Sequence, residues 1–147
     1  MNRPAGALAC IGLACWIAGC GGGGSSALIS RTSVRECLAN AQIGPQLPKD
    51  GSGYAPIYVS GPPPVYLDTA PDFTAYTANG VAVDVVVRGS AGRAQATAAH
   101  VRSVLSSLGT PPANVARRVV SGQNVAVVFT TPPSAADRSA VRSCLSG

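Results

Sequence analysis

The chain is poor in the residues that most often build catalytic and metal sites. It has one histidine, His100, six acidic residues among 147, and no Gly-x-Ser-x-Gly segment to present a nucleophilic serine. Asp68 and Asp72 lie four positions apart, but the dense ligand spacing of a calcium loop is missing around them, and turn formation explains both better. A hydrolase that uses Asp68, Asp72 or His100 is therefore the least favoured class, and we expect no cofactor and no metal.

Charge is also scarce and scattered along the chain. Charged residues make up 12% of the sequence, the formal net charge is +5, and no basic run is longer than Arg117-Arg118. This pattern favours an ordinary solvated surface over nucleic-acid binding. Attraction to anionic lipid headgroups or wall polymers is the weaker alternative.

Long apolar runs are missing as well, with one exception near the start of the chain. Residues 5–18 are apolar or glycine, follow a single positive charge at Arg3, and precede Gly19, Cys20 and the small residues 21–26. A run of about 14 residues is too short to span a bilayer comfortably and has the length of the apolar region of an export signal. The N-terminal segment therefore predicts an exported protein.

The residues Trp16-Ile17-Ala18-Gly19-Cys20 resemble the lipobox of bacterial lipoproteins. The resemblance implies that residues 1–19 are a signal peptide and that Cys20 becomes the acylated first residue, anchored at the extracytoplasmic face of the cell membrane. Residues 20–30 would then form a Gly/Ser-rich tether. An ordinary signal, or an uncleaved anchor, is the alternative. The composition further resembles that of small actinobacterial lipoproteins of unknown function, which implies no functional residue beyond Cys20.

The remaining cysteines form an even pair. Cys10 and Cys15 lie inside the predicted signal, which leaves Cys37 and Cys144. Each follows a valine by three positions and so lies on the apolar stripe of a predicted helix, and thiols tend to pair in an oxidising compartment. We predict a Cys37–Cys144 disulfide, which closes a loop of roughly 100 residues and contributes about 4–5 kcal/mol in the chain-entropy model. Two separate buried thiols are the alternative.

Hydrophobic periodicity predicts one small α+β domain over residues 31–147. Helices are expected from Ser33, over 91–108 and from Ser134 to Leu145, and strands over 81–88, 115–120 and 125–131. A strand-helix-strand crossover, a hairpin and a final helix predict a two-layer mixed sheet with its helices mainly on one face and an extra N-terminal helix. The shape resembles ferredoxin-like folds, a resemblance that implies no chemistry.

The segment 43–79 is rich in proline and glycine and is expected to be irregular, with short edge strands at 58–59 and 65–67. It also holds most aromatic residues of the predicted mature chain: Tyr54, Tyr58, Tyr66, Phe73 and Tyr76. Tyrosine suits protein or sugar surfaces, so these residues are a candidate partner surface. The alternative, which we favour, is that the rings fasten the segment onto the sheet.

The turn Gly89-Ser90-Ala91-Gly92-Arg93 follows a predicted strand and opens a predicted helix. Its amides, with Ser90, Gly92 and Arg93, form a candidate anion site, although a plain strand-to-helix turn fits equally well. Taken together, the sequence predicts a non-catalytic, lipid-anchored envelope protein that binds a protein partner or a cell-wall polymer. An anion-binding lipoprotein that uses this turn is the alternative.

Overall fold

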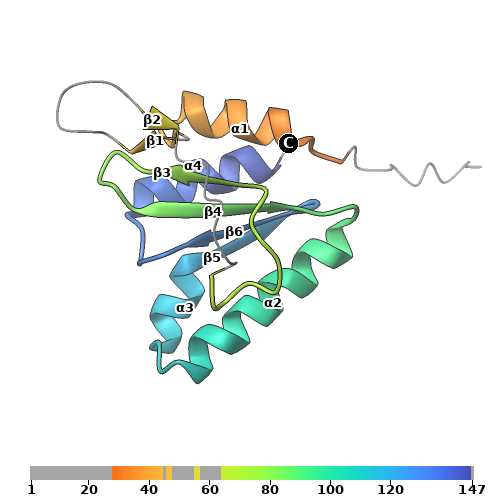
Figure 1. Ribbon diagram of the computed structural model, residues 1–147, viewed down its shortest axis with the longest axis vertical. Helices are drawn as coiled ribbons and strands as arrows, with labels where there is room; N and C mark the ends of the chain where they lie inside the picture. Colours follow the sequence, from red (N-terminus) through yellow and green to blue (C-terminus); the bar gives the residue numbers. More distant parts are fainter. Residues whose placement is uncertain (1–27, 45, 48–54, 57–63, 147) are drawn as a thin grey trace, which may run out of the picture.

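The computed structural model describes residues 28–44, 46–47, 55–56 and 64–146, and Figure 1 shows their arrangement. The main sheet is antiparallel, and its strands follow the spatial order β3 (Phe73–Tyr76), β4 (Ala82–Val87), β6 (Val125–Phe129) and β5 (Val119–Gly122). Four helices accompany it: α1 (Arg31–Asn40), α2 (Ala91–Ser107), α3 (Pro112–Arg118) and α4 (Ala135–Ser146). A separate pair joins β1 (Gln46–Leu47) to β2 (Ala55–Pro56).

The predicted α+β class and N-terminal helix are confirmed, but the sheet differs from the prediction in two respects. First, β4 and β5 run in the same direction without touching, because β6 lies between them and is antiparallel to both. The sheet is therefore antiparallel and not mixed. Second, α1 and α4 cover one face while α2 and α3 cover the other, so the domain has three layers and not two.

The central strand β6 explains why a three-layer arrangement is needed. All five of its residues are buried. Val125, Val127 and Phe129 pack under α1 and α4, whereas Ala126 and Val128 pack under α2 and α3. Because successive side chains of a strand alternate between faces, a strand that is apolar on both sides must be covered on both sides. This also accounts for the unbroken apolar runs in the hairpin, which hid its register in the sequence.

The predicted strand over 115–120 is wrong in its first half. Residues 112–118 form the helix α3, and β5 begins only at Val119. Pro111 is the N-cap of α3 and Pro112 opens it, where the fixed φ of proline suits a first helical turn. The two prolines that follow α2 thus begin the next helix.

The other predicted elements lie close to their expected positions. The strand over 81–88 is β4, the helix over 91–108 is α2, and α4 begins after Ser134, whose Oγ accepts from Asp137 N at 3.1 Å. The first helix begins earlier than predicted. Its cap is Ser30, whose Oγ accepts from Ser33 N at 3.0 Å, so Ser33 lies inside α1 and does not open it.

The segment 43–79 is more regular than predicted, because it contains β3 at one edge of the sheet. Phe73–Tyr76 pairs with β4 in register, with Thr74 opposite Asp84, and Gly44 bridges to Tyr76 on the outer side. The strand expected over 65–67 is instead a turn in which Leu67 N donates to Pro64 O at 2.8 Å. The strand expected at 58–59 lies outside the described residues.

The predicted disulfide is confirmed and joins the first helix to the last. Cys37 of α1 and Cys144 of α4 are bonded with their Cα atoms 5.7 Å apart, across 107 positions of sequence. Val34, Leu38, Val141 and Leu145 are buried beside the bond. The first and last helices are therefore held together on the same face of the sheet.

Candidate functional site

The predicted lipidation site, Cys20, lies outside the described residues, but the structure shows where the chain that follows it enters the fold. Ile29 N donates to Asn124 Oδ1 at 2.8 Å, and Asn124 Nδ2 donates to Ile29 O at 3.0 Å and to Arg88 O at 2.8 Å. Asn124 is only 2% exposed. Since Ser30 also caps α1, residues 29 and 30 belong to the folded domain and not to the tether predicted over 20–30.

Tyr66, a candidate for the partner surface, is buried under the segment that carries it. Its hydroxyl donates to Asp84 Oδ2 at 2.6 Å, and Thr74 Oγ1 donates to Asp84 Oδ1 at 2.7 Å. Burial, and then the hydrogen bond and negative charge of Asp84, raise the pKa of the Tyr66 hydroxyl well above its usual range. Tyr66 therefore stays a neutral donor that fastens the 64–72 segment to β4, and it does not belong to an accessible partner surface.

The other candidate aromatic residues do not gather on one surface either. Phe73 and Tyr76 are partly exposed and lie three positions apart on β3, so their side chains point to opposite faces of the sheet. Phe73 packs at the margin of the core under α1 and α4. Tyr54 and Tyr58 lie outside the described residues, so a partner surface built on them stays a prediction.

The candidate anion turn has the geometry of an ordinary helix start. Ser90 is the N-cap of α2, and its Oγ accepts from Arg93 N at 3.3 Å, while Ser90 O accepts from Ala94 N at 3.1 Å. A Cβ added at Gly92 would meet no atom within 4 Å, so no close approach requires glycine there. The Ser90 hydroxyl thus accepts a hydrogen bond from the Arg93 amide, which an incoming anion would otherwise accept. The Arg93 side chain is exposed.

The residues considered for hydrolysis are held by separate partners. Asp72 pairs with Arg31 and its Oδ2 accepts from Val87 N at 2.8 Å, whereas Asp68 lies 3.7 Å from Arg88. His100 is exposed on α2. Each aspartate therefore pairs with a different arginine. In the described part of the chain, no hydrogen bond joins the two carboxyl groups.

Within residues 28–44, 46–47, 55–56 and 64–146, no three His, Cys, Asp or Glu side chains come together as a metal site. In the same part of the chain, no helix combines the length and apolar character needed to cross a bilayer.

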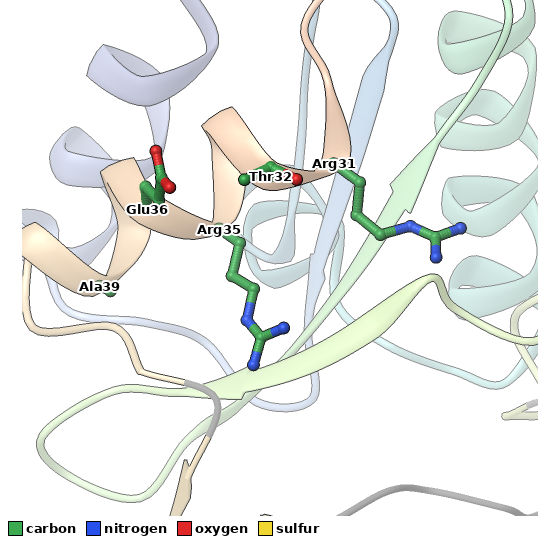
Figure 2. Close-up of a pocket in the computed structure, with 5 residues that line it drawn as sticks. All are labelled: Arg31, Thr32, Arg35, Glu36 and Ala39. Carbon is green, nitrogen blue, oxygen red and sulfur yellow. The ribbon is translucent and has the colours of Figure 1, made fainter.

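A shallow depression of about 350 Å³ lies along the exposed side of α1. Its lining consists of Arg31, Thr32, Arg35, Glu36 and Ala39. In Figure 2 the guanidinium of Arg35 and the carboxyl group of Glu36 point to opposite sides of the helix. Because Arg31 already pairs with Asp72, Arg35 is the lining cation without an acidic partner among the described residues. One such charge on an open surface suits a single weakly held anion.

Two important polar residues were missed in the sequence. Asp84 lies within the strand predicted over 81–88, and Asn124 lies between the two predicted strands of the hairpin, so neither was singled out. Both side chains are buried, and both form hydrogen bonds with residues distant in sequence. No local pattern identifies such partners, although an isolated aspartate within a run of valines is a signal of a buried polar contact.

No family model matches this chain, and neither the curated proteins nor the solved structures contain a significant match to it.

Proposed function

We propose that this protein is a lipid-anchored, extracytoplasmic module of the cell envelope that binds another envelope component and performs no catalysis. Cys20 is the proposed anchor. The observation that carries the proposal is the N-terminal pattern of one positive charge, an apolar run and the sequence Trp16-Ile17-Ala18-Gly19-Cys20.

The Cys37–Cys144 disulfide supports the same location from an independent direction. Disulfides form and persist mainly in oxidising compartments outside the cytosol. The two cysteines that follow Cys20 are both used in this bond, which leaves Cys20 as the remaining thiol of the predicted mature chain. A single leftover cysteine at the predicted cleavage site is what acylation requires.

The roles of the acidic side chains support a binding module. Among the described residues, Asp68 and Asp72 pair with arginines, Asp84 fastens the 64–72 segment, and Asp137 accepts from Ser134 at the start of α4. Each of these carboxyl groups already stabilises the fold. A stable, disulfide-closed domain held near a membrane is well suited to presenting a surface.

The decisive experiment is the intact mass of the full-length protein extracted from its own membranes, with and without reduction. We expect a chain that starts at Cys20 and carries acyl groups, and a gain of two hydrogens on reduction. The Cys20→Ala variant should lose both the acyl mass and membrane association. A native protein that retains residues 1–19, or that lacks acyl groups, contradicts the proposal.

A further inference from the structure

Four arginines gather where the end of α3 meets the start of α4. Arg117 and Arg118 form the last turn of α3, and Arg138 and Arg142 lie one turn apart on α4. We call these four residues the arginine patch. They are about 20 positions apart in sequence, and the helix α3, which was predicted as a strand, brings the two pairs together.

The patch is held in place by hydrogen bonds that cross between the two helices. Arg117 Nη2 donates to Pro133 O at 2.9 Å, just before α4, and Arg138 Nη2 donates to Ala116 O of α3 at 2.8 Å. Arg118 Nε donates to Phe129 O at 2.8 Å, and its guanidinium lies 5.9 Å from the centre of the Tyr66 ring. Three of the four side chains are thus fixed by the backbone, so little side-chain entropy is lost when a ligand binds.

The positive charge of the patch is not neutralised within the described part of the molecule. The ion pairs there join Arg31 to Asp72 and Arg88 to Asp68, and none involves the patch. Burial of part of its guanidinium, and the nearby charges of Arg142 and Arg117, lower the pKa of Arg138. Arg138 Nε is also buried without an acceptor. Arg117, Arg138 and Arg142 therefore repel one another, and an anion bound across them would relieve that repulsion.

The composition of the patch distinguishes between kinds of partner. Protein interfaces usually have an apolar or aromatic centre surrounded by a polar rim. The exposed large apolar residues of the described chain are Leu28, Val65 and Leu108, none of which belongs to α3 or α4, and Tyr66 beneath Arg118 is buried. Guanidinium groups match the planar or forked oxygen pairs of carboxylates and phosphates. Clustered charge without an apolar centre favours a repeating polyanion.

The position of the patch argues against the membrane as its partner. In Figure 1, α3 and the first turn of α4, which carry Arg117, Arg118 and Arg138, lie at the opposite edge of the molecule from the start of α1. Arg142 lies one turn further along α4. Since the described chain begins at the start of α1, the side from which the proposed anchor extends lies away from the first three of these arginines.

We propose that the arginine patch binds an anionic polymer of the cell envelope whose repeating groups are phosphates or carboxylates. This inference deepens the proposed function by naming the surface and the chemistry of its ligand. The proposed lipid anchor would hold the domain in the envelope, where such a polymer is accessible.

The test compares two charge reversals that change the net charge equally. Arg142→Glu alters an exposed member of the patch for which the structure shows no hydrogen bond. Arg102→Glu makes the same change at a partly exposed position of α2. The full-length protein in neutral detergent is titrated with polyphosphate, polygalacturonate, uncharged dextran and phosphatidylglycerol vesicles. We expect binding to at least one of the two polyanions, weakening with added salt, and about tenfold weaker for Arg142→Glu. Arg102→Glu should change the affinity by less than about twofold.

The polyanion that binds identifies the group, phosphate or carboxylate. Equal losses in both variants would show unspecific charge attraction and overturn the inference, as would the absence of polyanion binding. Binding to the vesicles alone, when lost in Arg142→Glu, would assign the patch to lipid headgroups and overturn it too. None of these results depends on acylation, so failure here is distinguishable from failure of the anchor, which the intact mass reports.

Discussion

The two faces of the sheet are closed by different kinds of interaction. Under α1 and α4 lies the larger cluster of buried apolar residues, and a disulfide joins the two helices. Under α2 and α3 the apolar cluster includes small side chains, such as those of Ala98 and Ala126. At one edge of this face, Tyr66 and Thr74 donate hydrogen bonds to the buried carboxyl group of Asp84. The face under α1 and α4 joins the first helix to the last, whereas the face under α2 and α3 holds the internal segment 64–72.

This difference shows how a short chain covers a sheet on both sides. The helices α2 and α3 lie mainly over β5 and β6, and Tyr66 of the 64–72 segment reaches Asp84 of β4 on this face instead. A segment without regular structure has few apolar residues to bury, so it is fixed by hydrogen bonds to a buried carboxyl group. We expect the apolar face to determine global stability and the polar margin to determine how easily the segment opens.

The largest expected effect comes from breaking the covalent link of the apolar face. The double variant Cys37→Ser, Cys144→Ser should lower the free energy of unfolding by about 4 kcal/mol, because the unfolded chain regains the entropy that the cross-link removes. Equilibrium urea unfolding measures the loss, and reduced wild-type protein should show the same value. A decrease below about 1 kcal/mol would show that apolar packing alone holds the two ends together.

The next effect comes from the polar margin of the other face. Asp84→Ala leaves the hydroxyl groups of Tyr66 and Thr74 buried without an acceptor and should cost about 3 kcal/mol. Asp84→Asn keeps one acceptor oxygen and the shape of the side chain, so it should cost about 1 kcal/mol. Limited proteolysis supplies a second readout, since cleavage within 64–72 should accelerate most in the alanine variant. Equal cleavage rates in all three proteins would contradict the fastening role.

A third prediction concerns the close approach of α4 to the sheet. A Cβ at Gly122 would lie 2.8 Å from Leu145 Cβ and 2.9 Å from Leu145 O, which belongs to the backbone. Gly122→Ala should therefore destabilise the fold by about 2 kcal/mol through overpacking. Gly92→Ala is the matched control, because a Cβ there meets no atom within 4 Å. Thermal unfolding should show a lower midpoint for the first variant and an unchanged or slightly higher one for the second.

The elements that the sequence predicted well are those with local signals. β4 has a run of valines, and α2 and α4 combine an apolar period with a capping serine, Ser90 or Ser134. All three elements lie within a few residues of their expected bounds. The disulfide was predictable because parity left only Cys37 and Cys144. These predictions depend on residues close together in sequence, or on the number of cysteines.

The features that were missed depend on contacts between distant segments. α3 was assigned to a strand because Val115, Val119 and Val120 look alike in sequence, while only tertiary packing separates the helix from β5. β3 was missed because the extended conformation of these four residues depends on backbone pairing with β4 and not on a pattern of their own. The arginine patch had no signal at all, since its two pairs are brought together by that misassigned helix.

The smallest effect belongs to the Tyr66 hydroxyl and appears as a dependence on pH. Tyr66→Phe should cost about 1.5 kcal/mol at neutral pH, because Asp84 then loses one of its two donors. In the folded protein the pKa of Tyr66 is raised above the value of about 10 that holds in the unfolded chain. The stabilisation from this tyrosine is therefore complete below about pH 10 and is lost as the pH rises toward the folded pKa.

Urea unfolding between pH 9 and 11 tests this dependence directly. Above pH 10 the unfolded tyrosine loses its proton while the folded one keeps it, so the wild-type free energy of unfolding should fall by up to about 1.4 kcal/mol per pH unit from this group. Tyr66→Phe should lack that part of the slope. Thr74→Val removes the other bond to Asp84 but keeps the tyrosine, so it should retain the slope. If Tyr66→Phe and wild type decline in parallel, Tyr66 ionises as easily in the fold as in water, and the margin under α2 and α3 is open to solvent rather than closed by a buried hydrogen bond.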